Sequence, residues 1–142
     1  MQSFRHPHRV TYAECTLGNH VFYGRYLDIL EEARGEFFRA LGSPLKRLES
    51  EDCIFPVVKC QVQYRAPARY DDLLTVELWI ETLTAVRVEF AYRIFSPSGT
   101  ILLTASTLHA CTTAGEKIRK QPAALLSALG AYVHPSAEPA SS

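Results

Sequence analysis

The sequence predicts one α+β domain, in which a single long helix covers one face of an antiparallel sheet of about five strands. The length of 142 residues suits one ordinary domain with one hydrophobic core. One segment repeats its apolar residues at helical spacing, and four later segments are rich in β-branched and aromatic residues. Two breaks between those later segments are so short that they require antiparallel hairpins. One helix packed on one sheet satisfies these patterns.

The first third of the chain contains a short strand and the long helix. Residues 10–14 alternate in polarity, which predicts a half-buried strand, and Gly18-Asn19 predicts a turn after it. Helical periodicity begins at Phe22 and continues for about five turns. Gly42 and Pro44 are stop signals for this helix. The apolar residues of its predicted buried face are Phe22, Tyr26, Ile29, Leu30, Ala33, Phe37 and Leu41.

The rest of the chain, after a polar link at 46–52, predicts four long strands and a terminal helix. The strands are expected at 54–64, 73–83, 86–95 and 100–112. An amphipathic stretch predicts the helix at 122–132. We therefore expect one domain over 1–142, with a core at about 9–133 and an Ala-, Ser- and Pro-rich tail at 134–142.

Such a sheet has two free edges, whose backbone groups lack partners. We expect the last strand, 101–111, or a neighbour of it to pair across a two-fold axis into a continuous dimeric sheet. The chain is therefore predicted to be a homo-oligomer.

Charge and hydropathy exclude several classes of function. The 15 Lys and Arg residues balance 15 Asp and Glu residues, which removes the broad positive charge typical of nucleic-acid and anionic-membrane binders. The first twenty residues contain no continuous apolar core of a signal peptide, and no apolar run in the chain approaches the length of a membrane span. We expect a cytoplasmic protein with no nucleic-acid partner and no membrane association.

Cysteine and histidine spacing indicates neither a metal site nor a disulfide framework. The cysteines form no CxxC pair, and we expect them in or near the core. They are Cys15, Cys53, Cys60 and Cys111. His6 and His8 lie in an Arg-His-Pro-His stretch that we expect to be a poorly ordered N-terminal arm. No metal and no other cofactor is predicted.

Two segments of the chain contain family motifs. The first reads YAECTLGNHVFYGRYL at 12–27 and continues as EARGEF at 32–37. The second reads VQYRAPARYDD at 62–72. In this order they resemble the loop, helix start, strand and turn of hotdog-fold acyl-CoA thioesterases of the hydroxybenzoyl-CoA thioesterase and Tol-Pal-associated type.

The resemblance implies the hotdog fold, in which an antiparallel sheet wraps a long central helix. It also implies a homodimer, in some members paired into a tetramer, with two active sites at the subunit interface. The implied substrate is a thioester of coenzyme A or of an acyl carrier protein. Its phosphopantetheine arm would run in a groove between subunits, and its acyl group would enter beside the helix.

One position departs from the family pattern. The family's loop carries an aspartate that acts as nucleophile or general base, and Thr16 stands at that position here. A threonine hydroxyl is not a general base, and it is a poor nucleophile unless a neighbour removes its proton. The loop is also similar to that of thioesterases of enediyne polyketide pathways, which have an amide residue there and rely on an oxyanion hole and a helix arginine. Arg34 matches the position of that arginine.

The start of the helix predicts an oxyanion hole. Unpaired backbone N–H groups and the positive end of the helix dipole suit a thioester carbonyl as it gains negative charge. The candidate N–H groups belong to Val21, Phe22, Tyr23 and Gly24. Arg34 lies about three turns into the helix and would anchor a water, the loop or a carboxylate across the interface. A solvated pair with Glu31 or Glu32 is the alternative interpretation.

The loop itself offers four candidate side chains. Thr16 and Asn19 would orient a water or bond the carbonyl, although a local cap suits Thr16 equally and a turn suits Asn19 better. His20 is a candidate general base, with capping or packing as the stronger interpretation. Glu14 lies two residues before Thr16, so a strand there would place both side chains on one face and let the carboxylate replace the missing acid. A loop at that point would remove this argument.

The candidates for binding the coenzyme A phosphates are Lys59, Arg65, Arg69 and a basic run at 117–120, although such a run is more often a solvated turn. The sequence thus predicts hydrolysis of an acyl-CoA or acyl-carrier-protein thioester to free acid and thiol, with no covalent intermediate. The alternative is a non-catalytic hotdog dimer that binds or senses an acyl thioester. A hydratase on the same fold is a weaker third hypothesis, since no catalytic His/acid pair follows at a helix start.

Overall fold

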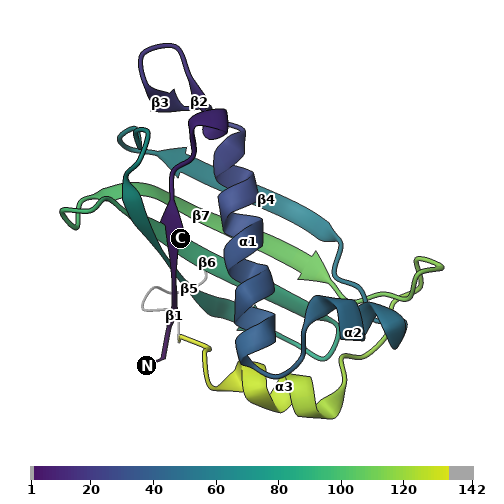
Figure 1. Cartoon of the computed structure of the whole chain (residues 1–142). Helices are drawn as coiled ribbons and strands as arrows, with labels where there is room; N and C mark the ends of the chain where they lie inside the picture. The colour runs from purple at the N-terminus through teal and green to yellow at the C-terminus, as the bar shows by residue number, and fades with distance from the viewer. Residues whose placement is uncertain (1, 135–142) are drawn as a thin grey trace.

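One long helix lying across a five-stranded antiparallel sheet dominates the fold of residues 2–134, the part of the chain that the computed structural model describes (Figure 1). The sheet has the order β1-β5-β6-β7-β4, which confirms the predicted α+β class. Its strands are β1 (Phe4–Arg9), β4 (Val57–Tyr64), β5 (Leu73–Leu83), β6 (Arg87–Phe95) and β7 (Ile101–Ala110). A separate hairpin pairs β2 (Cys15–Thr16) with β3 (His20–Val21). The helices are α1 (Arg25–Ala40), α2 (Leu45–Ser50) and α3 (Ala123–Gly130).

The buried stripe of α1 forms the centre of the core. Tyr26, Ile29, Leu30, Ala33 and Phe37 are buried, as their helical spacing predicted. Aromatic rings gather around the last of these, with centroid distances of 4.8–6.0 Å; they belong to Phe4, Phe38, Phe90 and Tyr132. Phe22 was predicted on the same stripe, but it is exposed because the helix begins three residues later.

The N-terminal segment differs from both predictions made for it. His6 and His8 do not lie in a poorly ordered arm; they belong to β1, which pairs with β5. The strand predicted at 10–14 is instead a 3-10 turn at Tyr12–Glu14. β1 alternates half-buried and exposed residues, but its inward positions are largely polar, so hydropathy does not reveal the alternation. Pro7 is tolerated because β1 is an edge strand.

β4 occupies the other edge of the sheet. β7 lies between β6 and β4, so the last strand is internal and its neighbour holds the free edge. Along this edge Val57 and Val58 are exposed, and Lys59 is the sole charged residue of the strand. Cys60 is also exposed, contrary to the prediction that it lies in or near the core, because nothing among the described residues covers this part of the edge strand.

Helix α2 and the C-terminal segment complete the described chain. α2 forms within the predicted polar link because Leu48 is buried against the core. α3 confirms the predicted terminal helix. His134 still belongs to the fold, since its backbone N–H donates to the carbonyl of Ile80 at 2.9 Å. The predicted tail at 135–142 lies outside the described residues.

Residues 2–134 contain neither a membrane-spanning helix nor a cluster of metal ligands. None of the helices there combines the length and apolar character that crossing a bilayer requires. No group of three or more His, Cys, Asp and Glu side chains there is arranged to hold a metal ion.

Candidate active site

The β2–β3 loop lies at the N-terminal end of α1 (Figure 1). Gly18 and Asn19 adopt φ angles of 80° and 60°, which make the tight turn of this loop. The side-chain oxygen of Asn19 accepts the backbone N–H of Tyr70 at 3.1 Å, so the geometry gives this residue the turn role. Thr16 and His20 face each other across the hairpin as Cα partners. The threonine is exposed and the histidine half-buried.

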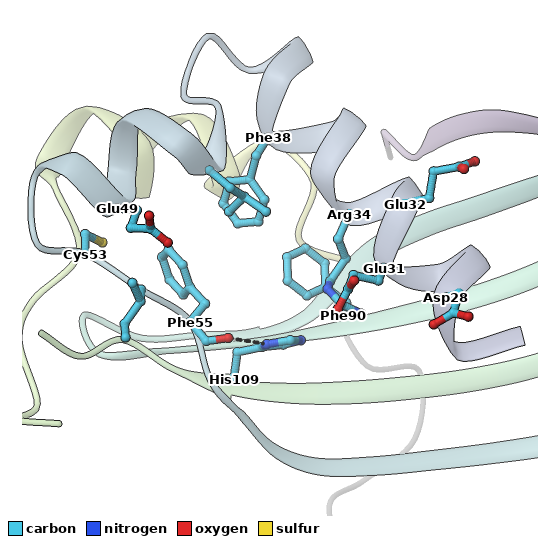
Figure 2. Close-up of a pocket in the computed structure, with 12 residues that line it drawn as sticks. Asp28, Glu31, Glu32, Arg34, Phe38, Glu49, Cys53, Phe55, Phe90 and His109 are labelled. Atoms are coloured by element: carbon cyan, nitrogen blue, oxygen red, sulfur yellow. Dashed lines mark hydrogen bonds and ion pairs between the residues drawn. The ribbon is translucent and has the colours of Figure 1, made fainter. Parts of the chain in front are cut away.

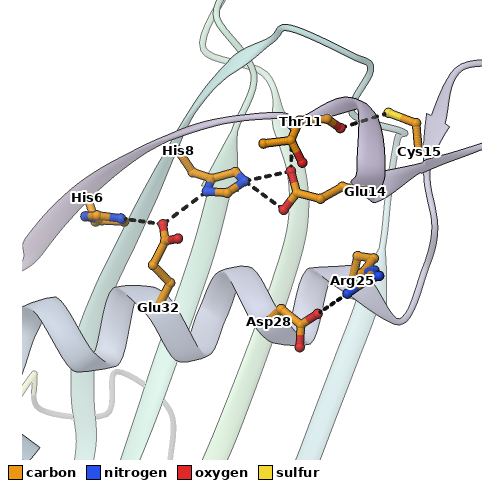
Figure 3. Close-up of polar contacts among 8 residues, drawn as sticks. All are labelled: His6, His8, Thr11, Glu14, Cys15, Arg25, Asp28 and Glu32. Atoms are coloured by element: carbon orange, nitrogen blue, oxygen red, sulfur yellow. Dashed lines mark hydrogen bonds and ion pairs between the residues drawn. The ribbon is translucent and has the colours of Figure 1, made fainter.

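Glu14 is engaged away from the loop (Figure 3). Its two carboxylate oxygens lie 3.0 and 2.9 Å from Nε2 of His8, and one of them accepts the backbone N–H of Thr11 at 2.7 Å. Because the residue ends a 3-10 turn rather than lying in a strand, it shares no strand face with Thr16. The prediction that this carboxylate replaces the missing loop acid therefore loses its structural basis.

His8 joins this turn to α1 (Figure 3). Its Nδ1 lies 3.0 Å from a carboxylate oxygen of Glu32, which also contacts Nε2 of His6 at 2.7 Å. Burial lowers the pKa of His8, but hydrogen bonds and charges from Glu14 and Glu32 outweigh burial and raise it. Burial also raises the pKa of Glu32, but its two histidine partners more than reverse this and lower it. The cluster ties β1 and the start of the loop to the helix.

The predicted oxyanion hole narrows to two N–H groups. Those of Val21 and Phe22 already donate to backbone carbonyls at 3.0 and 2.8 Å, so in this conformation they are not available to a substrate. Those of Tyr23 and Gly24 have no backbone acceptor within residues 2–134 and lie directly before α1. The positive end of the helix dipole is located at the same point. Together they form a suitable position for a carbonyl oxygen that gains negative charge.

A pocket of about 490 Å³ opens beside α1, between this helix, α2 and the sheet (Figure 2). Its walls are mainly aromatic and aliphatic, and acidic side chains line it as well. The apolar lining residues are Phe38, Leu45, Ile54, Phe55 and Phe90. The acidic ones are Asp28, Glu31, Glu32 and Glu49. Arg34, Cys53 and His109 complete the lining.

A chain of hydrogen bonds holds Arg34 at the wall of this pocket. Its Nη1 donates to the hydroxyl of Tyr92 at 3.0 Å, and that hydroxyl bonds the hydroxyl of Thr107. The threonine oxygen lies 2.9 Å from Nε2 of His109. Nδ1 of the same imidazole bonds the carbonyl oxygen of Phe55 at 3.0 Å, as the dashed line in Figure 2 shows. Tyr92, Thr107 and His109 are all buried.

The charges of the pocket are unevenly distributed. Burial lowers the pKa of His109 to about 4, so this imidazole is neutral at pH 7. Burial also raises the pKa of Tyr92, so its hydroxyl keeps its proton. Glu31 lies 3.9 Å from Nη2 of Arg34, with a side chain that is 76% exposed. The mainly apolar pocket thus contains one cation, the guanidinium group of Arg34, and the exposed carboxylate of Glu31 lies close to it.

The structure does not bring all of the predicted site residues together within one protomer. Arg34 lies ten residues after Gly24, or about 15 Å along the helix axis, which is farther than an arginine side chain reaches. The N–H groups at the helix start and the guanidinium group of Arg34 therefore lie at two separate places on one chain. Sequence reasoning found Arg34 through the family motif but missed the buried pair of Thr107 and His109. The sequence pattern that could have revealed this pair is the spacing of two residues within a strand, which places both polar side chains on the same face of β7.

The basic candidates are also separated. Arg65 and Arg69 are exposed on the segment after β4, which contacts the loop through the bond from Val21 N–H to the Ala68 carbonyl. Lys59 is exposed nearer the other end of β4. In the run at 117–120, Arg119 bonds the backbone carbonyls of 51, 52 and 120, so it has a structural role.

Comparisons with known proteins agree on one family. The thioesterase superfamily profile matches residues 18–103. An acyl-CoA thioester hydrolase YbgC from Escherichia coli O6:H1 is 33% identical over 122 residues, which cover 86% of this chain and 89% of the relative. A hypothetical protein from Thermus thermophilus has a TM-score of 0.84 at 30% identity, covering 90% of this chain and 98% of its own. A 1,4-dihydroxy-2-naphthoyl-CoA thioesterase from Synechocystis has a TM-score of 0.85 at 26% identity, covering 94% and 100%.

Proposed function

The chain belongs to the thioesterase superfamily, and we propose that it hydrolyses acyl-coenzyme A thioesters in sites shared between two protomers. In this reaction water adds to the thioester carbonyl, the carbon–sulfur bond breaks, and a carboxylic acid and a thiol leave. Coenzyme A is favoured over a carrier protein as the thiol, because the named relatives act on acyl-CoA and naphthoyl-CoA thioesters. The observation that carries the proposal is the pocket that contains Arg34. This pocket lies near one end of β4, and the β2–β3 loop lies near the other end.

The free edge of β4 supports a shared site. At one end of this strand the hydroxyl of Tyr64 donates to the carbonyl of Tyr23 at 2.9 Å, next to the start of α1. At the other end Val57 pairs with His109, next to the pocket. Antiparallel pairing of β4 with the same strand of a second copy would reverse these ends. The helix start of one protomer would then lie beside the pocket of its partner.

Exposed apolar side chains at both ends fit this arrangement. Leu17 on the loop is 94% exposed and Tyr23 is 67% exposed. Val57 and Val58 expose about half of their surface at the opposite end of the edge strand. Apolar groups clustered at an unpaired sheet edge are typical of an interaction surface. A homodimer is the partner that this surface fits best, and pairing of dimers into a tetramer is not required.

Each half would contribute a different part of the chemistry. The N–H groups of Tyr23 and Gly24 would receive the carbonyl oxygen, and the acyl group would occupy the partner's pocket. Thr16 and His20, which pair across the β2–β3 hairpin just before these N–H groups, would hold the attacking water. Because Thr16 leaves the loop without an acid, the carboxylate closest to Arg34, that of Glu31, is the best-placed general base.

The thiol end of the substrate would extend over the basic surface. Arg65 and Arg69 follow β4 on the loop side, and Lys59 lies on the edge strand itself. Guanidinium groups bind phosphate oxygens in pairs of hydrogen bonds. These three cations are the candidates for the coenzyme A phosphates.

Thiol release from short, medium, long-chain and aromatic acyl-CoA substrates tests the proposed function. We expect turnover by the purified chain and a loss of about 100-fold or more in kcat for Glu31→Gln, as removal of a general base gives. Glu36→Gln is the matched control, since Glu36 lies on the same helix and pairs only with Arg39 among the described residues. Binding of acyl-CoA by calorimetry without any thiol release would overturn hydrolysis and favour a sensing protein. Full activity of Glu31→Gln would exclude Glu31 as the base.

A further inference from the structure

We propose that Tyr92, Thr107 and His109 form a relay that positions the guanidinium group of Arg34 in the pocket. The inference rests on the proposed function and adds three residues, none of which touches the reacting atoms. Two of them come from β7 and one from β6. The relay ends on the backbone carbonyl of Phe55, whose ring lines the same pocket.

The direction of every proton in the relay follows from its last member. A carbonyl oxygen only accepts, so Nδ1 of His109 must donate to Phe55. The neutral imidazole therefore has an unprotonated Nε2, which accepts the hydroxyl proton of Thr107. The threonine oxygen then accepts from Tyr92, because its own proton is already donated. The tyrosine oxygen is left with lone pairs only, and these receive Nη1–H of Arg34.

This order of donors explains why the end of the relay opposite to Phe55 contacts a cation. A guanidinium group only donates hydrogen bonds, and it stays charged in proteins. The relay presents it with an oxygen whose proton points away, which is the arrangement that attracts a donor most strongly. Reversal of any single bond would leave two donors or two acceptors facing each other, at a cost typical of an unpaired buried polar group.

Arg34 needs such support because its other contact is weak. The remaining partner among the described residues is Glu31 at 3.9 Å, an exposed carboxylate within the same helix. An arginine side chain loses considerable rotamer entropy when it is fixed in one orientation, and an exposed ion pair within a helix offsets little of that cost. The bond to Tyr92 is therefore the contact that selects one orientation. The hydroxyl oxygen of Tyr92 is buried, so water does not take its place while the core stays packed.

A purely structural role would be the competing explanation. Buried hydroxyl and imidazole groups require partners in any protein, and Tyr92, Thr107 and His109 satisfy one another. The two explanations differ in what happens when Arg34 is absent. A positioning relay has no remaining effect on the reaction in that background, whereas a structural defect acts in either background.

The test uses Tyr92→Phe and Thr107→Val in the full-length chain, each alone and combined with Arg34→Ala. We expect each single relay variant to lower kcat about tenfold, as loss of one hydrogen bond gives, with KM changed less than twofold. Thr107→Ser should restore kcat, since it returns the hydroxyl. In the Arg34→Ala background neither variant should lower kcat further. Equal losses in both backgrounds, or unchanged kcat in the single variants, would overturn the relay.

A second measurement does not depend on activity and separates the relay from the proposed function. In protein labelled with ¹⁵N-arginine, rotation of the Arg34 guanidinium should be slow in the native chain and fast in Thr107→Val. The signal is assigned by its loss in Arg34→Lys. Thr112→Val is the matched control, because Thr112 is also a buried threonine and lies outside the relay. Fast rotation in the native chain, or slow rotation in Thr107→Val, would contradict the relay even if thiol release is observed.

Discussion

At the scale of single residues, the charges of this site are located on the helix and not on the loop. Thr16 is uncharged, and Glu14 is engaged by His8. Arg34 and Glu31 lie together at the pocket instead. The imidazole of His109 adds no charge at neutral pH because burial holds its pKa near 4. We therefore propose that the pocket half of the site activates the attacking water.

His109 also makes a contribution to the pH dependence of stability. Its pKa is about 4 in the folded chain and about 6.5 when unfolded, so the unfolded chain binds more protons between these values. The contribution of His109 to the free energy of unfolding is therefore fully present above pH 6.5. It is lost as the pH falls toward 4, and the loss amounts to about 3 kcal/mol.

The variant His109→Gln isolates this effect, because glutamine does not titrate. Urea unfolding from pH 7 to pH 4 should show a smaller loss of unfolding free energy in the variant than in the native chain. Titration of His8 and Glu32 contributes to both proteins and cancels in the comparison. Parallel curves for the two proteins would contradict a neutral buried His109.

At the scale of elements, the sequence predicted the helices and strands whose residues follow a local periodic pattern or lie next to short turns. The buried stripe of α1 follows from helical spacing, and the hairpins of β5, β6 and β7 follow from short breaks. β1 was missed because its inward positions include His6 and His8, whose partners on α1 and in the turn only tertiary structure supplies. The relay was missed for the same reason, since Arg34 and Tyr92 are 58 residues apart.

The direction of backbone groups on β4 allows a specific test of its free edge. Arg65 N–H donates to the carbonyl of Leu102 on β7 at 2.9 Å, so alternation turns the N–H groups of Gln63 and Gln61 toward β7. The backbone N–H groups of Val62 and Cys60 then point away from β7, toward the free edge of the sheet.

Cys60→Pro removes one of these outward N–H groups without removing a bond to β7. We expect the native chain to sediment as a dimer and the variant to shift toward monomer, because proline blocks strand pairing at an edge. Cys60→Ala is the control and should remain dimeric. A dimeric Cys60→Pro chain would exclude β4 as the pairing strand.

At the scale of the whole molecule, we propose that the homodimer is the unit of catalysis. Within one protomer Gly24 and Arg34 lie about 15 Å apart along the axis of α1. Antiparallel pairing of β4 would bring complementary halves together twice per dimer.

The most direct test mixes two variants that are each strongly impaired but keep a measurable residual rate. Arg34→Ala removes the pocket cation, and Gly24→Pro removes one N–H group at the helix start, where φ is −70° and therefore suits proline. In a mixed dimer one site carries both lesions and the other carries neither. Thiol release should then recover to about a quarter of the native rate, since half of randomly assorted dimers are mixed and each has one intact site. Absence of recovery in verified mixed dimers would show that both residues serve the same protomer's site and would contradict the shared site.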